Sequence, residues 1–64
     1  MEMWTKSQFQ TIIKLLEYGG WVQKMEPSEF EGVLRVSIKH SEQRDGDWTE
    51  VYLIGRDGDK IKVN

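Results

Sequence analysis

The tetrapeptide Arg-Asp-Gly-Asp occurs twice in this chain of 64 residues, at 44–47 and again at 56–59. Alternate aspartates beside a glycine could begin a calcium-binding loop, whose ligands come from positions 1, 3 and 5 and from a glutamate at position 12. Counted from the first aspartate of each copy, position 5 is Thr49 or Ile61, and position 12 of the first copy is Arg56. Neither copy supplies the ligand set, so we expect no metal site.

The other reactive residues offer little for catalysis. Nucleophilic catalysis needs a nucleophile beside a base, and this chain has one histidine, His40, and no cysteine. Ser41 would diverge from His40, because neighbours on a strand point to opposite faces. We expect His40 on the inner side of a sheet, satisfied by a backbone carbonyl. No phosphate-binding loop, paired metal-ligand spacing or cofactor fingerprint is present, so we expect neither an enzyme nor a cofactor.

Length and composition predict one small domain, residues 1–64. Nine basic and eleven acidic residues give a net charge of −2, which does not by itself indicate a nucleic-acid-binding protein. The absence of cysteine excludes disulfides and thiolate metal sites. No apolar run approaches the roughly 18 residues that cross a bilayer, and the first residues lack the layout of a signal peptide. We therefore expect a cytoplasmic protein without a membrane partner.

Residues 5–18 carry the start and stop signals of a helix. Thr5 and Gln8 match a capping box, and the glycine pair at 19–20 can end the helix without a steric penalty. Apolar side chains recur at helical spacing between these signals. They are Phe9, Ile12, Ile13 and Leu16. We expect this stripe to face the core.

Strands are predicted at about 21–25, 33–40, 47–54 and 60–63. The last three alternate apolar and polar residues, and Asp-Gly between such segments is the strongest short hairpin signal. We therefore interpret both Arg-Asp-Gly-Asp copies as turns. The fold class is α+β, with one N-terminal helix packed in two layers on a three- to four-stranded antiparallel β-meander.

Keeping one sheet face apolar sets the expected register. A two-residue turn at Asp45-Gly46 pairs Ile38 with Leu53. A three-residue loop over 56–58, with its glycine left-handed, pairs Leu53 with Ile61. The core then contains the helical stripe and, from the strands, Leu34, Val36, Ile38, Val51, Leu53, Ile61 and Val63, with Trp21 joining it.

The outer sheet face provides the candidate binding site. This register places five side chains together there: Arg35, Lys39, Trp48, Tyr52 and Ile54. Contiguous exposed apolar patches mark partner sites, and Trp, Tyr and Arg are enriched at binding hot spots. We expect a non-enzymatic binding or regulatory protein that contacts another protein, or a second copy of itself, through this face. Domains this small without a catalytic set are often accessory or inhibitory proteins of phages and mobile elements.

A single-stranded nucleic acid is the alternative partner. Bases would stack on Trp48 and Tyr52, with phosphates near the lysines. The negative net charge and the acidic turns favour a protein instead.

A third reading rests on a resemblance. The segment IIKLLEYGGW, residues 12–21, resembles the opening of HicA-type toxins, small ribonucleases related to double-stranded-RNA-binding domains, whose first helix ends at a glycine and tryptophan before a sheet. The resemblance implies an RNA-acting fold. That family's Gly-Ser-His segment has no counterpart in WVQKMEPSEFEG and its final helix is missing, so no activity is carried over.

Overall fold

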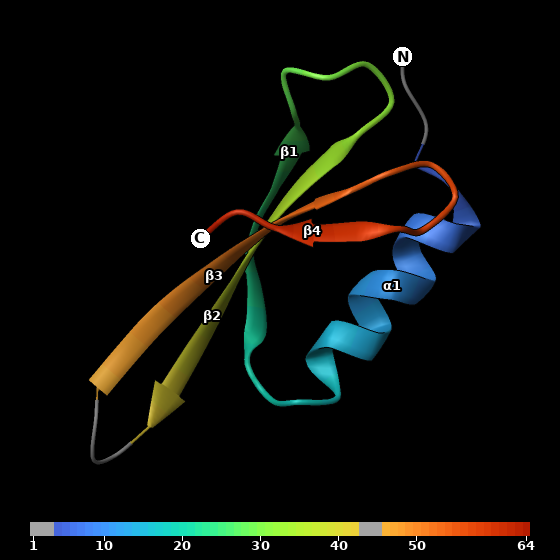
Figure 1. Ribbon diagram of the computed structural model, residues 1–64. Helices are drawn as coiled ribbons and strands as arrows, with labels where there is room; N and C mark the ends of the chain where they lie inside the picture. The colour runs from blue at the N-terminus through green and yellow to red at the C-terminus, as the bar shows by residue number, and fades with distance from the viewer. Residues whose placement is uncertain (1–3, 43–45) are drawn as a thin grey trace.

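The computed structural model describes residues 4–42 and 46–64. One helix precedes a four-stranded antiparallel sheet with strand order β1-β2-β3-β4 (Figure 1). The elements are α1 (Lys6–Leu16), β1 (Trp21–Pro27), β2 (Leu34–Glu42), β3 (Gly46–Ile54) and β4 (Lys60–Lys62). The helix packs on one side of the sheet, here named the covered face, and the opposite side is the uncovered face. The expected two-layer α+β class is confirmed.

The hairpin of β2 and β3 extends well beyond the helix, so the molecule is elongated, with extents of 40 × 21 × 19 Å. Among the described residues, no helix is both long and apolar enough to cross a membrane.

Gln8 ties the start of the helix to two other parts of the chain. The expected capping box is present, because the Thr5 hydroxyl accepts from the Gln8 N–H at 3.1 Å and Gln8 Oε1 accepts from the Thr5 N–H at 2.7 Å. The Gln8 side chain is fully buried. Its Nε2 donates to the carbonyls of Gly32 at 2.9 Å and Ile54 at 3.1 Å. One amide thus joins the helix to the loop before β2 and to the end of β3.

Two hydroxyl groups orient the helix by holding one of its flanks at the β4 edge of the sheet. Thr11 Oγ1 donates to the carbonyl of Gly58 at 2.6 Å, and Thr5 Oγ1 donates to the carbonyl of Arg56 at 2.7 Å. Both acceptors lie in the loop between β3 and β4, so this flank lies toward the β4 edge. Successive helical residues turn by about 100°, which places Phe9 and Ile13 on the opposite flank, toward β1.

The expected apolar stripe of the helix is only partly buried. Ile12 is buried and Leu16 is partly buried against the core, whereas Phe9 is 45% and Ile13 is 60% exposed; Leu15, outside the expected stripe, is buried. The prediction that the whole stripe faces the core is wrong for these two residues. The buried amide of Gln8 occupies part of the inward-facing arc, so the helix is rotated and its most apolar flank lies beside the sheet.

The register between β2 and β3 differs from the expected one. Ile38 pairs with Glu50, not with Leu53, and Glu42 pairs with Gly46. The two-residue turn at Asp45-Gly46 is therefore wrong, since Gly46 already belongs to β3; Asp45 lies outside the described residues. The partner of Ile38 moves from position 53 to position 50, an odd number of residues, so every β3 side chain takes the face opposite to the expected one.

The second hairpin has the expected register and loop. Leu53 pairs with Ile61. The Gly55 N–H donates to the carbonyl of Asp59 at 2.8 Å, and the Gly58 N–H donates to the carbonyl of Gly55 at 2.9 Å. Gly58 has a φ of +94°, in the left-handed region that favours glycine. The second Arg-Asp-Gly-Asp copy is therefore a turn, with residues 56–58 as its loop.

The core lies between the helix and the covered face. It contains Ile12, Leu15, Leu34, Val36, Ile38 and Ile54. Four residues expected in the core lie instead on the uncovered face because of the register shift: Val51, Leu53, Ile61 and Val63. Trp21 is also outside the core and exposed.

Two isoleucines test this division of the sheet. Ile54→Ala should cost about 2–5 kcal/mol of unfolding free energy, because Ile54 is fully buried. Ile61→Ala removes the same atoms from a side chain that is 67% exposed, and should cost about 0.5 kcal/mol or less. Urea unfolding followed by circular dichroism measures both, and equal losses would contradict the register.

A second pair of variants tests the buried amide. Gln8→Leu keeps most of the side-chain volume but removes the donor to Ile54 and half of the capping box. We expect a loss of about 1–3 kcal/mol in unfolding free energy. Gln10→Leu, the same change at an exposed position of the same helix, is the control and should be nearly neutral. An equally small effect at Gln8 would show that the amide does not hold the helix in place.

Candidate functional site

The five residues expected to form one binding surface are divided between the two faces of the sheet. Trp48, Tyr52 and Ile54 point to the covered face, because they pair with the alternate β2 residues that are buried there. Ile54 is fully buried in the core, and Trp48 remains partly exposed beyond the helix. Arg35 and Lys39 point to the uncovered face. The expected grouping of the five side chains is therefore wrong.

His40 lies on the covered face, as expected, close to the turn that follows the helix. Its ring stacks on Trp48, with centroids 4.8 Å apart and planes 9° from parallel. Gly20 packs directly against it, since a Cβ at this position would lie 2.9 Å from His40 Nδ1 and 2.8 Å from the carbonyl oxygen of Lys39. Gly20 also has a φ of +91°. A glycine is thus required where the chain passes His40.

A single carboxylate joins three strands at this end of the sheet. Glu50 Oε1 lies 2.7 Å from His40 Nε2, and Glu50 Oε2 lies 2.8 Å from Lys62 Nζ. The partner of His40 is therefore this carboxylate and not a backbone carbonyl. These contacts connect β2, β3 and β4 beyond the reach of the helix.

Three pKa values are shifted in and beside these contacts. The hydrogen bond from Lys62, aided by its charge and by His40, lowers the pKa of Glu50 below its ordinary value of 4.5, although burial opposes this. The hydrogen bond to Glu50 raises the pKa of Lys62 above 10.5. Burial, followed by the nearby Glu50 carboxylate, raises the pKa of Tyr52 above 10.0.

A shallow hollow opens beside these groups. It is lined by Tyr18, Gly19, Gly20, His40, Ser41, Trp48 and Glu50. Ser41 pairs with Asp47 on the uncovered face, so its hydroxyl points away from the His40 ring. Within residues 4–42 and 46–64, no group of three or more His, Cys, Asp or Glu side chains could hold a metal ion.

Four apolar side chains cluster on the uncovered face over β3 and the neighbouring segment that contains β4. We name Val51, Leu53, Ile61 and Val63 the apolar quartet. Leu53 pairs with Ile61, and the Val63 N–H donates to the Val51 carbonyl at 2.8 Å, so the quartet forms two cross-strand pairs. Ile61 and Val63 are exposed. Trp21 of β1 lies on the same face, because it pairs with Lys39.

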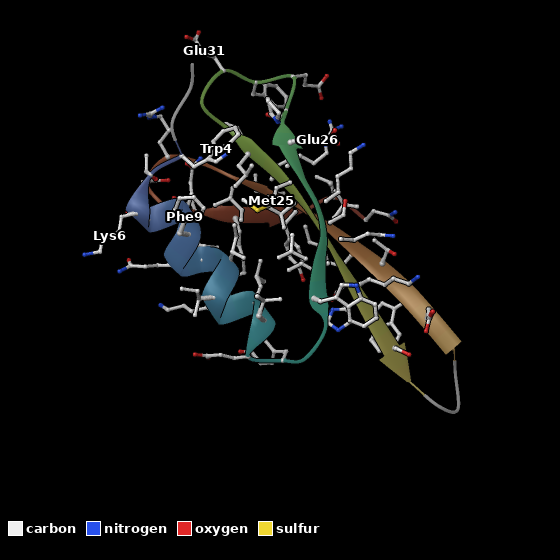
Figure 2. The ribbon with its side chains drawn as sticks, turned by 180° about the vertical axis from the view of Figure 1, so that it is seen from behind. Trp4, Lys6, Phe9, Met25, Glu26 and Glu31 are labelled. Atoms are coloured by element: carbon white, nitrogen blue, oxygen red, sulfur yellow. The ribbon has the colours of Figure 1, made fainter. Side chains whose placement is uncertain are left out.

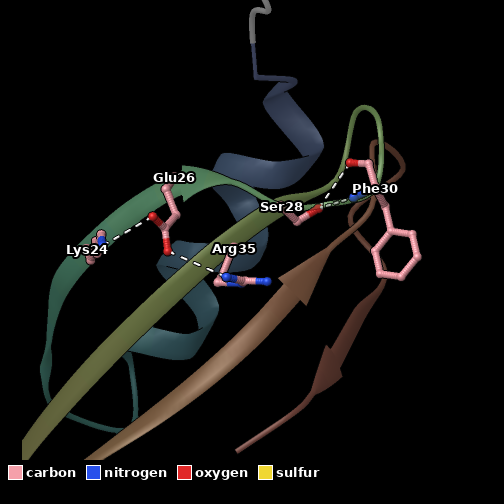
Figure 3. Close-up of polar contacts among 5 residues, drawn as sticks. All are labelled: Lys24, Glu26, Ser28, Phe30 and Arg35. Carbon is pink, nitrogen blue, oxygen red and sulfur yellow. Dashed lines mark hydrogen bonds and ion pairs between the residues drawn. The ribbon is translucent and has the colours of Figure 1, made fainter.

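The charges on this face are paired within the chain. Glu26 lies between two cations, 3.2 Å from Lys24 Nζ and 3.8 Å from Arg35 Nη1 (Figure 3). Lys39 Nζ lies 3.6 Å from Asp47 Oδ2. The uncovered face therefore combines an exposed apolar area over β3 and β4 with largely neutralised charges over β1 and β2.

Sequence reasoning assigned Arg35 and Lys39 to the outer face correctly but missed the apolar quartet and Trp21. The alternation in β3 gives both of its faces apolar side chains, so the pattern alone does not choose between them. What determines which face of β3 is buried is the length of the connection between β2 and β3, because this length sets the register of the two strands.

No protein-family model matches this chain, and neither the curated proteins nor the solved structures include a significant match. The resemblance to HicA-type toxins therefore rests on residues 12–21 alone.

The Glu50 contacts predict a pH dependence of stability. Because the folded-state pKa of Glu50 is lowered, its contribution is present above pH 4.5 and is lost as the pH falls through the folded-state value. Because the pKa of Lys62 is raised, its contribution is present below pH 10.5 and is lost as the pH rises through the folded-state value. Thermal melts should show a smaller acid-induced fall in Tm for Glu50→Gln than for the wild type. Parallel curves below pH 4.5 would contradict the assignment.

Proposed function

We propose that this chain is a non-enzymatic binding or regulatory protein that acts by protein–protein contact through the uncovered face. The observation that supports this proposal is the exposure of Ile61 and Val63, beside the half-buried Val51 and Leu53, on a sheet face that carries no helix. Exposed apolar side chains that are contiguous, rather than scattered, are typical of partner sites. The quartet would form the centre of the contact and the ion-paired residues its rim.

The charge pattern favours a protein partner with an apolar surface over a nucleic acid. Binding of single strands uses unpaired cations together with aromatic platforms. Here Lys24, Arg35 and Lys39 each lie within 4 Å of a carboxylate of the same chain. Trp48 and Tyr52, the expected platforms, point to the other face of the sheet. A partner surface that excludes water from the quartet fits this face better than a row of phosphates.

The proposal is tested by changing the quartet without changing the core. In Ile61→Thr with Val63→Thr, two exposed apolar side chains become polar, while β-branching preserves the strand preference. Tyr18→Ser removes a large side chain that is also exposed but lies in the turn after the helix, and serves as the matched control. Affinity capture from cells that produce the chain, quantified by mass spectrometry, compares the proteins bound by each variant.

Proteins that the wild type and Tyr18→Ser capture should be recovered with the double variant in amounts about tenfold or more lower. A loss of this size is typical of hot-spot residues. Circular dichroism melts verify that the double variant is folded. Capture of the same proteins by the double variant would exclude the uncovered face as the site. Binding of oligonucleotides that weakens steeply with salt would instead support a nucleic-acid partner.

A further inference from the structure

A second apolar surface lies at the β1 edge of the sheet, distinct from the apolar quartet. We name Phe9, Ile13 and Met25 the edge cluster; their exposed fractions are 45%, 60% and 39%. Phe9 and Ile13 belong to the helix flank that lies away from β4, and Met25 points to the covered face because it pairs with Val36. Figure 2 shows Phe9 on α1 and Met25 beside β1 on the same side of the molecule. The apolar flank of the helix therefore extends toward the position that a further strand beside β1 would occupy.

The backbone of β1 is arranged to accept such a strand. The Ser28 N–H donates to the carbonyl of Val33, and the pairing continues regularly through Glu26 opposite Arg35. Hydrogen-bonded pairs alternate along an antiparallel ladder. Glu26 and Lys24 thus direct their backbone groups to β2, whereas Met25 directs its N–H and C=O to the open edge. Pro27 also faces this edge, so its missing N–H removes no bond to β2.

The opposite edge of the sheet is protected against pairing. β4 has only three residues, Lys60–Lys62, and lysines on a short edge strand oppose the addition of another chain. The helix flank above it is polar, since Thr11 and Lys14 line the surface there together with Lys60. β1 also contains a lysine, a proline and a bulge. It differs from β4 in its length of seven residues against three and in the apolar helix flank beside it, and these two features favour association at β1.

The residues of β1 are complementary to a second copy of themselves. If two β1 strands pair antiparallel with Met25 opposite Met25 of the second copy, Lys24 lies opposite Glu26 of that copy and Glu26 opposite its Lys24. Directly opposite side chains of opposite charge stabilise an antiparallel pair. The bulge between Val22 and Lys24 lies outside these central pairs. The two Met25 residues would exchange both of their backbone hydrogen bonds.

We propose that two copies of this chain associate through β1 in this register, which joins their sheets into one of eight strands with a twofold axis at Met25. Three strand spacings, about 14 Å in all, would separate the two β2 strands. Each helix with its side chains is about 10–12 Å wide, so the two helices would fit side by side above the joined sheet. Phe9 and Ile13 of the two copies would therefore face one another above the new β1 pair. This association uses the sheet edge and leaves the apolar quartet free, so it does not depend on the proposed function.

Charge reversal tests the register. Lys24→Glu places carboxylates opposite carboxylates across the twofold axis, and Glu26→Lys places ammonium groups opposite ammonium groups. Each single change should weaken the dimer by about tenfold or more, because like charges face one another. The double variant Lys24→Glu with Glu26→Lys restores both pairs, and its Kd should return to within about threefold of the wild type, since a threefold change is less than half of one tenfold step in affinity. Sedimentation equilibrium of the purified chain from about 10 μM to 1 mM measures each Kd in the range of weak complexes.

A change at the helix provides independent evidence for the same interface. Ile13→Gln should weaken the dimer, whereas Lys14→Gln, at an exposed position directed away from the edge cluster, should not. Circular dichroism confirms folding of each variant. A wild-type chain that stays monomeric up to about 1 mM, the weak end of the affinity scale, or a dimer unaffected by both single charge changes, would overturn the inference. A dimer that is lost in Ile61→Thr with Val63→Thr but kept in the charge variants would place self-association on the uncovered face.

Discussion

The buried amide of Gln8 is the constraint on which the arrangement of helix and sheet depends. Its three hydrogen bonds, to Thr5, Gly32 and Ile54, require the side chain to point into the protein. A buried amide without partners would cost several kcal/mol, so this requirement dominates the preference of the helix for burying its most apolar flank. The small core and the exposure of Phe9 and Ile13 therefore have the same cause. Burial of Gln8 with Ile12 and Leu15 leaves Phe9 and Ile13 at the side of the sheet.

The register of the first hairpin determines in the same way which β3 side chains lie on each face of the sheet. It places Glu50 on the covered face, beyond the helix, where the carboxylate contacts the His40 ring and pairs with the Lys62 ammonium. It also moves Val51 and Leu53 to the uncovered face, where they meet Ile61 and Val63. A helix that covered the whole sheet would leave no room for the charged cluster. The protein instead stabilises the far end of its sheet with an ion-paired carboxylate and a stacked ring pair.

Much of the fold could be predicted from the sequence because local signals agree with it. The capping box at Thr5 and Gln8, the Gly58 loop and the pairing of Leu53 with Ile61 are all present. The face that carries the apolar quartet could not be predicted, because Val51 and Leu53 alternate with Tyr52 and Ile54, and either pair could face a core. Only the length of the connection between β2 and β3 decides which pair is buried. The local sequence favours a two-residue Asp-Gly turn, which gives the wrong register. The inward orientation of Gln8 was also not predictable, since its acceptors Gly32 and Ile54 are distant in sequence.

The contacts that hold the helix also determine when it can become ordered. The acceptors of Gln8, Thr5 and Thr11 at Ile54, Arg56 and Gly58 lie 46 to 51 residues further along the chain. Each pair of neighbouring strands, in contrast, is joined by a short connection, and such local pairings form faster than contacts between distant segments. During synthesis the helix leaves the ribosome before the sheet, yet three of its four acceptors, Ile54, Arg56 and Gly58, emerge more than forty residues later, and only Gly32 emerges sooner. The side chains of Ile12 and Leu15, which the folded protein buries, thus remain available to chaperones, or to another copy of the chain, until the last hairpin is complete.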